Sequence, residues 1–139
     1  TDRDAIEALI RAQFAALSWA PGSPPDYRPL LEGFLADARL YPSRRPLAPQ
    51  TPAAFCDRLD DLRKSGALTR FSERVSGLEV AIFGRVAVAM AGCEMLENDH
   101  TVTRDVSAFL LVKDNEDWCI AAQAWDLERQ DLTLPVRLG

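Results

Sequence analysis

Basic residues are scarce in this 139-residue sequence, and long apolar runs are missing altogether. The chain has 16 Lys and Arg against 21 Asp and Glu, and its net charge of −5 argues against general nucleic-acid or anionic-membrane binding. No apolar run approaches the roughly 20 residues of a membrane span. The first residues lack the charged and apolar regions of a signal peptide. We therefore expect a cytoplasmic protein without nucleic-acid or membrane partners.

Histidine and cysteine are also scarce. Cys56, Cys93 and Cys119 are odd in number and widely spaced, which argues against both a disulfide framework and a zinc knuckle. The only histidine, His100, falls in a predicted hairpin turn, and no clustered carboxylates replace a second histidine. Neither a glycine-rich phosphate loop nor a nucleophile elbow occurs. The sequence therefore predicts no metal site and no cofactor.

Proline is absent from a long stretch in the second part of the chain. Eight of the nine prolines lie between Pro21 and Pro52, and none occurs between residues 53 and 134. Because proline lacks the N–H that a sheet ladder needs, this division predicts helices and loops followed by continuous strands. No repeat or linker interrupts the sequence, so residues 1–139 are interpreted as a single domain.

Three helices are expected in the first part. Apolar residues recur at three- and four-residue steps over residues 4–18, which predicts an amphipathic helix. A second helix is expected from about residue 26 to about residue 40, with Pro29 in its first turn. A third is expected to begin at Pro52, capped by Thr51.

The second part alternates with a period of two, which predicts long antiparallel strands over residues 69–82, 86–97, 101–113 and 118–128. Long twisted strands curl, and the apolar face of the first helix is the expected filling of the concave side. The expected fold class is α+β, with three N-terminal helices packed on a strongly curved antiparallel sheet. Small inward residues at Ala89, Ala91 and Cys93 indicate either a cavity beneath the helix or tight helix packing.

Four segments carry a resemblance to a known superfamily. They read AIEALIRAQFAALSWA, GFLADARLYP, GRVAVAMAGCEM and DVSAFLLVKDNEDWCIAAQAWDLE. Across almost the whole chain the sequence resembles the nuclear transport factor 2-like superfamily, whose cone-shaped domains include ketosteroid isomerases, scytalone dehydratases and SnoaL-like cyclases. If the chain is an enzyme, this resemblance implies a lyase or an isomerase of the SnoaL-like type.

The catalytic positions of ketosteroid isomerases are not matched. Where the resemblance places the base, this chain has Pro42, and where it places the oxyanion acid the chain has Ser107, with Asp105 two residues away. The helix position of the oxyanion tyrosine falls near Gln13 or Phe14. We therefore expect no steroid isomerase activity, and the catalytic residues stay unassigned.

The cone pocket is the predicted binding site for a small hydrophobic or aromatic molecule. Alternation within strands and spacing within helices predict seven lining residues: Phe14, Tyr41, Phe55, Ser107, Phe109, Gln123 and Trp125. The alternative is a non-catalytic interaction module that uses the convex sheet face. Val86, Val88 and Met90 are expected on that face, and they favour a homodimer.

Overall fold

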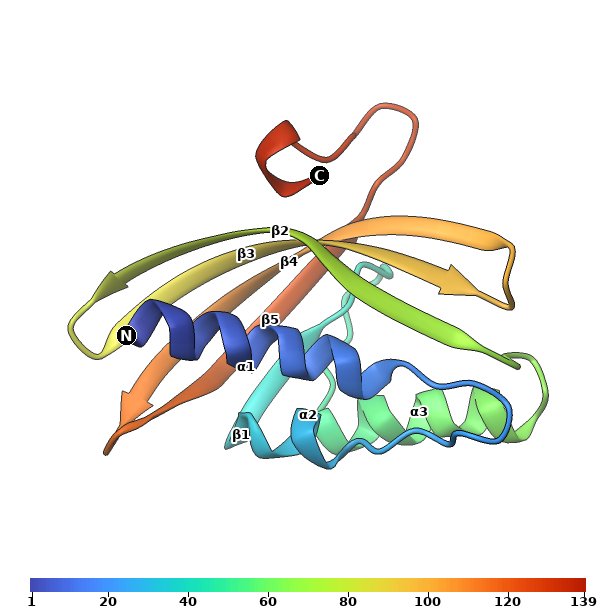
Figure 1. The fold of residues 1–139 in the computed structure, drawn as a ribbon, viewed down its shortest axis with the longest axis horizontal. Coiled ribbons are helices and arrows are strands. Elements are labelled where there is room, and N and C mark those ends of the chain that lie inside the picture. The colour runs from blue at the N-terminus through green and yellow to red at the C-terminus, as the bar shows by residue number, and fades with distance from the viewer.

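Helices cover one face of a curved five-stranded sheet (Figure 1). The computed structural model describes residues 1–139, and the α+β class expected from the sequence is confirmed. None of the helices is both long and apolar enough to cross a membrane. The elements are α1 (Asp2–Leu17), α2 (Arg28–Glu32), β1 (Phe34–Tyr41), α3 (Pro52–Lys64), β2 (Phe71–Phe83), β3 (Val86–Glu97), β4 (Thr101–Asp114), β5 (Asp117–Leu127) and a short 3-10 turn, η1 (Val136–Leu138).

The sheet has the order β1-β5-β4-β3-β2, and β1 is the element that the sequence did not predict. The predicted second helix is wrong beyond Glu32, because the chain then turns into a strand that pairs in parallel with β5. Ala38 and Leu40 of this strand are fully buried, at 0% and 2% exposure. Pairing with β1 covers the edge of β5, which would otherwise present unpaired N–H and C=O groups.

Two β-bulges set which side chains face the helices. One bulge lies in β2, where the register against β3 shifts between Val75 and Gly77. A second shift lies between Leu110 and Leu111 of β4, where β5 carries the extra residue Ala121. The alternation of β5 therefore changes at this point, so Cys119 and Gln123 do not share a face although their numbers differ by four.

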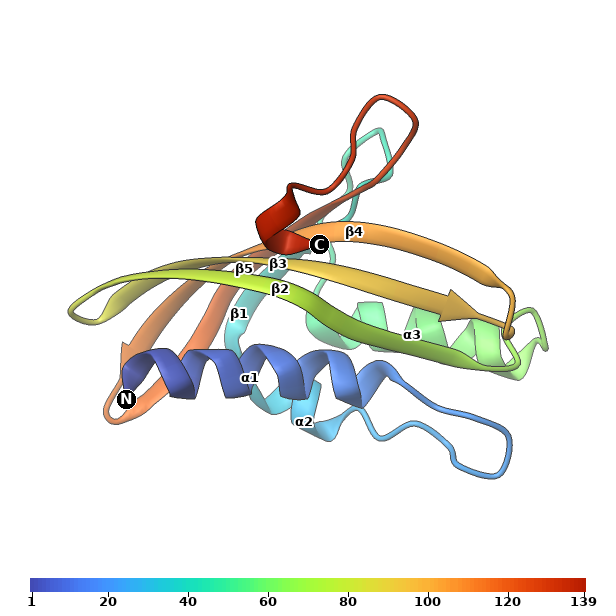
Figure 2. The same ribbon diagram turned by 45° about the horizontal axis from the view of Figure 1, so that its top comes forward.

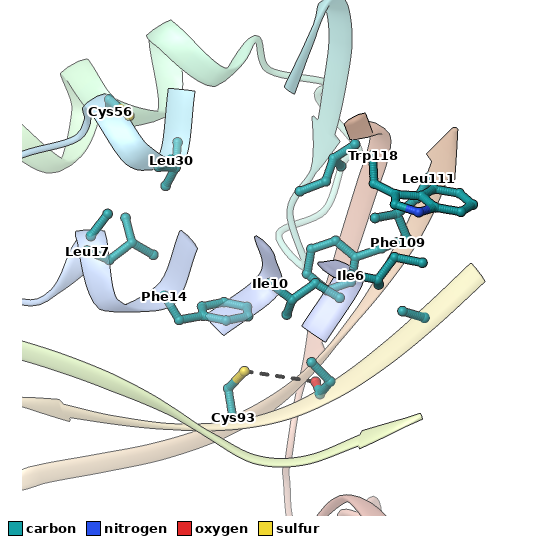
Figure 3. Packing of buried hydrophobic residues seen from close by; sticks show 14 of the residues in the cluster. Ile6, Ile10, Phe14, Leu17, Leu30, Cys56, Cys93, Phe109, Leu111 and Trp118 are labelled. Atoms are coloured by element: carbon teal, nitrogen blue, oxygen red, sulfur yellow. Dashed lines mark hydrogen bonds between the residues drawn. The ribbon is translucent and has the colours of Figure 1, made fainter. Parts of the chain in front are cut away.

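Part of the concave face is covered by α1, which lies closest to β2. Thr1 caps this helix by accepting a hydrogen bond from the Asp4 N–H at 3.1 Å, so the helix begins two residues before the predicted range of residues 4–18. Ile10 and Phe14 point from α1 toward the sheet, and Phe14 meets Phe109 edge-on with ring centroids 6.3 Å apart (Figure 3). Burial of this face supplies the core.

The N-terminal end of α1 is fixed to the β4–β5 hairpin by polar contacts. Asp2 Oδ1 accepts hydrogen bonds from the Trp118 indole and the Lys113 ammonium, each at 3.0 Å. These two donors, the indole first, lower the pKa of Asp2. The contact sets the position of the helix along the sheet, so the role of Trp118 is structural.

The C-terminal segment lies on the opposite, convex face of the sheet (Figures 1 and 2). Leu138 is fully buried there, and its carbonyl accepts a hydrogen bond of 2.7 Å from the Ser76 hydroxyl. Two glycines permit this approach: a Cβ at Gly77 would lie 2.6 Å from the Arg137 carbonyl oxygen, and one at Gly92 would overlap the Leu138 carbonyl. The tail therefore packs directly on the sheet backbone.

We predict that Gly92→Ala lowers the free energy of unfolding by about 1–3 kcal/mol, because the added methyl group overlaps the Leu138 carbonyl. Urea unfolding followed by circular dichroism measures the change. Gly139→Ala is the control, since its new Cβ would have ordinary contacts no closer than 3.6 Å. Equal stability of the two variants would contradict the packing of the tail.

Candidate functional site

A cavity of about 320 Å³ lies between α1, α3 and the concave side of the sheet. Its size falls within the usual range of small-molecule sites. The cavity opens to solvent, and its walls are mainly apolar. The apolar lining includes Phe14, Leu17, Leu30, Phe34, Leu40, Phe55, Leu59, Leu62, Leu68, Phe71, Met95 and Trp125.

Five of the seven side chains predicted from the sequence line this cavity: Phe14, Phe55, Ser107, Gln123 and Trp125. Phe55 of α3 and Trp125 of β5 form an edge-on aromatic pair with centroids 5.6 Å apart. Because the two rings come from different elements, they join the helical cover to the end of the sheet. The structure brings these five residues together in one cavity, and their role in binding a ligand stays a prediction.

The other two predicted residues lie outside the lining. Tyr41 belongs to a strand and not to the end of a helix, and its neighbour Leu40 is the residue that faces the cavity. Strand alternation therefore turns Tyr41 away. Phe109 is 3% exposed and packs behind Phe14 in the core, so it supports the wall without reaching the cavity.

Polar side chains are gathered on the sheet side of the cavity. The buried Gln13 amide of α1 donates a hydrogen bond of 2.8 Å to the Gln123 carbonyl oxygen. Ser107 is 2% exposed and Gln13 is 4% exposed. Gln13 Oε1 has no hydrogen-bond partner within the protein. An acceptor of this kind is costly to bury, by about 1–3 kcal/mol, so it favours a partner in the cavity.

Two carboxyl groups also lie in the cavity, one on each side of β3. Oxygen atoms of Glu73 in β2 and Asp105 in β4 lie within 4.8 Å of each other and of the Cys93 sulfur. Cys93 and Asp105 are paired directly across β3 and β4, and Glu73 lies one diagonal step away. The expectation that no carboxylates cluster in this chain is therefore wrong.

Burial makes these carboxyl groups weak acids. It raises the pKa of Asp105 to about 7. Burial, with a smaller contribution from the charge of Asp105, raises the pKa of Glu73 to about 8. Two carboxylates this close cannot both ionise cheaply in an apolar site, so the pair retains a proton near neutral pH. Groups that exchange a proton near neutral pH are suited to acid–base chemistry.

Glu73, Cys93 and Asp105 form the one cluster of potential metal ligands in the structure. The Cys93 thiol lies 3.9 Å from the Ala91 carbonyl oxygen as a donor, and burial raises its pKa strongly (Figure 3). A metal needs the thiolate, which this environment disfavours. The donor set is therefore poor for a metal ion, and we assign none.

The sequence analysis did not include Glu73 among the site residues and named Asp105 only in passing, although the positions of both residues in their strands indicated a site. Glu73 stands between Phe71 and Val75 on the inward side of its strand, and Asp105 precedes Ser107 by two residues. Charged residues are rarely buried unless paired. An inward carboxylate on each of the two strands that flank β3 is therefore an unusual pattern that predicts a site.

The remaining charged residues of the lining are Arg44, Arg58 and Glu97. Both arginines are exposed, and the Arg58 guanidinium lies 5.8 Å from the centroid of the Phe55 ring. His100 is exposed in the turn between β3 and β4, as expected, and it takes no part in the cavity.

Solved structures show that the chain has the nuclear transport factor 2-like fold. It is similar to a nuclear transport factor 2-like protein of unknown function from Pseudomonas putida, with a TM-score of 0.71 and 13% identity over 94% of this chain and 91% of that one. A second such protein, from Silicibacter pomeroyi, gives a TM-score of 0.63 and 19% identity over 91% and 96%. The chain is also similar to a hexachlorocyclohexane dehydrochlorinase, with a TM-score of 0.69 and 11% identity over 99% of this chain and 93% of that one. No family model and no curated protein matches the sequence.

We predict that wild-type stability falls between about pH 5 and pH 8, because a carboxyl group whose pKa is raised in the folded state loses its stabilising proton as the pH rises. Asp105→Asn should reduce this fall by about 1–3 kcal/mol, since it removes a buried charge. Urea unfolding at pH 5 and pH 8 measures the free energy of unfolding of each variant. Asp37→Asn, at an exposed carboxylate, is the control and should keep the wild-type pH dependence. An unchanged pH profile in Asp105→Asn would contradict the burial of this charge.

Proposed function

We propose that the protein binds a compact, largely apolar or aromatic molecule in the cone cavity. The observation that carries this proposal is the cavity of about 320 Å³, with aromatic walls and a few buried polar groups on one side. Apolar walls supply affinity through burial of the ligand, and the polar groups fix its orientation.

The buried polar groups also favour a ligand over an empty site. Gln13 and Asp105 each bury an oxygen atom without a partner in the protein, which a ligand or an ordered water molecule would satisfy. Glu73 and Asp105 are the buried acid–base groups of the cavity, so a proton transfer to or from the ligand would use this pair. A lyase or isomerase reaction is the form of catalysis that such a pair supports best.

We predict that Trp125→Ala weakens the binding of a neutral aromatic probe, benzyl alcohol, by about tenfold, because the indole forms part of the cavity wall. Binding is measured by NMR titration. The Trp125 indole signal should shift in the wild type. The Trp118 indole, which is bonded to Asp2 outside the cavity, should stay in place.

Phe83→Ala is the matched control, since Phe83 is an aromatic residue that is 87% exposed on β2 and outside this cavity. It should bind the probe as the wild type does. Probe binding that is unaffected by Trp125→Ala, or absent in the wild type, would contradict the proposed site.

A second function, homodimerisation through the convex sheet face, is favoured by a specific row of side chains. Val86, Val88 and Met90 of β3 are 51%, 55% and 42% exposed, and Leu110 beside them on β4 is 47% exposed. Val88 and Leu110 pair directly across the two strands, so the exposed residues form a continuous apolar surface. Exposed surfaces of this kind often become interfaces between subunits.

We predict that Val88→Glu converts a dimer into a monomer of 15.4 kDa, because it places a charge at the centre of the apolar row. Light scattering at micromolar concentration measures the mass. The same change at Leu31, which is 39% exposed on α2 at the helical side of the sheet, is the control and should leave the dimer intact. A monomeric wild type would rule out this interface.

A further inference from the structure

Every unpartnered buried atom that faces the cavity is a hydrogen-bond acceptor. Gln13 Oε1 and Asp105 Oδ1 have no partner, and both residues are only 4% exposed. The donor side of the Gln13 amide is already used, since it is bonded to Gln123. These two acceptors of the lining are therefore suited to a ligand that donates hydrogen bonds.

The same lining carries negative charge that the protein itself does not balance. Burial is the main influence on Glu73 and Asp105, and no cationic side chain contributes to lowering the pKa of either group. Cys93, the third group beside them, is a neutral thiol, and Glu97 adds a further carboxylate to the lining. The two arginines of the lining, Arg44 and Arg58, are exposed, so solvent screens their charges.

An apolar or neutral ligand would leave this charge buried and uncompensated. A retained proton halves the charge of the pair but does not cancel it, because one carboxylate remains. A single monovalent cation cancels the remainder. An ammonium group also brings three N–H donors, which matches acceptors on Glu73, Asp105 and Gln13.

Building on the proposed binding function, we propose that the ligand is a compact aromatic or aliphatic amine whose protonated nitrogen lies between Glu73 and Asp105. Its apolar body would lie against the aromatic walls, among them Phe55 and Trp125. Gln13 accepts the third hydrogen bond and fixes the orientation of the ammonium group from α1.

The proposal has a definite pH signature. Protonation of both Glu73 and Asp105 removes the negative charge, so amine affinity falls as the pH drops below about 7, the pKa of Asp105. A neutral ligand of the same shape makes no ionic contact and keeps its affinity. Cys93 stays a thiol throughout this range, because burial raises its pKa strongly.

Isothermal titration of the full chain with benzylammonium and with benzyl alcohol tests the proposal. At pH 8 we expect benzylammonium to bind the wild type at least about tenfold more tightly, and at pH 5 we expect the two probes to bind alike. Asp105→Asn and Glu73→Gln should each bring the affinity for the amine down to that for the alcohol. Glu97→Gln removes a carboxylate from the same lining and should preserve most of the preference.

The outcomes separate this proposal from the proposed function. Equal affinity of the wild type for both probes at pH 8 overturns the amine preference and leaves the binding function standing. A preference that survives both Asp105→Asn and Glu73→Gln overturns the assigned position of the ammonium group. Failure to bind either probe overturns both proposals. The pH series on the wild type tests the amine preference even if a variant misfolds. Circular dichroism shows whether each variant is folded.

Discussion

The position of α1 on the curved sheet is the constraint on which the rest of the molecule depends. A sheet this curved has a concave face that must be covered, and α1 covers part of it, lying closest to β2. Asp2 anchors the first turn of the helix to the β4–β5 hairpin. The helix thus fills one half of the concave face, and the other half stays open as the cavity beneath α3.

Because the helix leaves part of the concave face open, polar groups are buried at the boundary between core and cavity, and this costs folding free energy. Glu73, Asp105 and Gln13 lie at this boundary, with too little water for full solvation and without protein partners for all their oxygens. Apolar residues at the three positions would stabilise the fold more. Buried polar groups that weaken a fold in this way are typical of sites that receive a ligand.

The sequence predicted most of the fold, because its signals are local. Thr51 and Pro52 mark the start of α3, and period-two alternation marks β2 to β5. The strand β1 escaped prediction because Leu30, Leu31 and Phe34 also fit a helical stripe, and its pairing with β5 is a long-range choice. The same limit applies to the C-terminal tail, whose packing on Gly92 depends on two distant segments.

For the site, alternation placed Ser107, Gln123 and Trp125 correctly, since each lies in a regular strand beyond the bulge of β5. The prediction for Tyr41 was wrong because the residue was assigned to the end of a helix. In strand β1 its side chain points away from the cavity. Glu73 was missed for another reason. Its strand was predicted correctly, but its inward carboxylate was not connected with the inward carboxylate of Asp105 on the other side of β3. Cross-strand register joins such residues into a site. Inward charged residues on two strands that flank a third therefore predict a site as well as inward aromatic residues do.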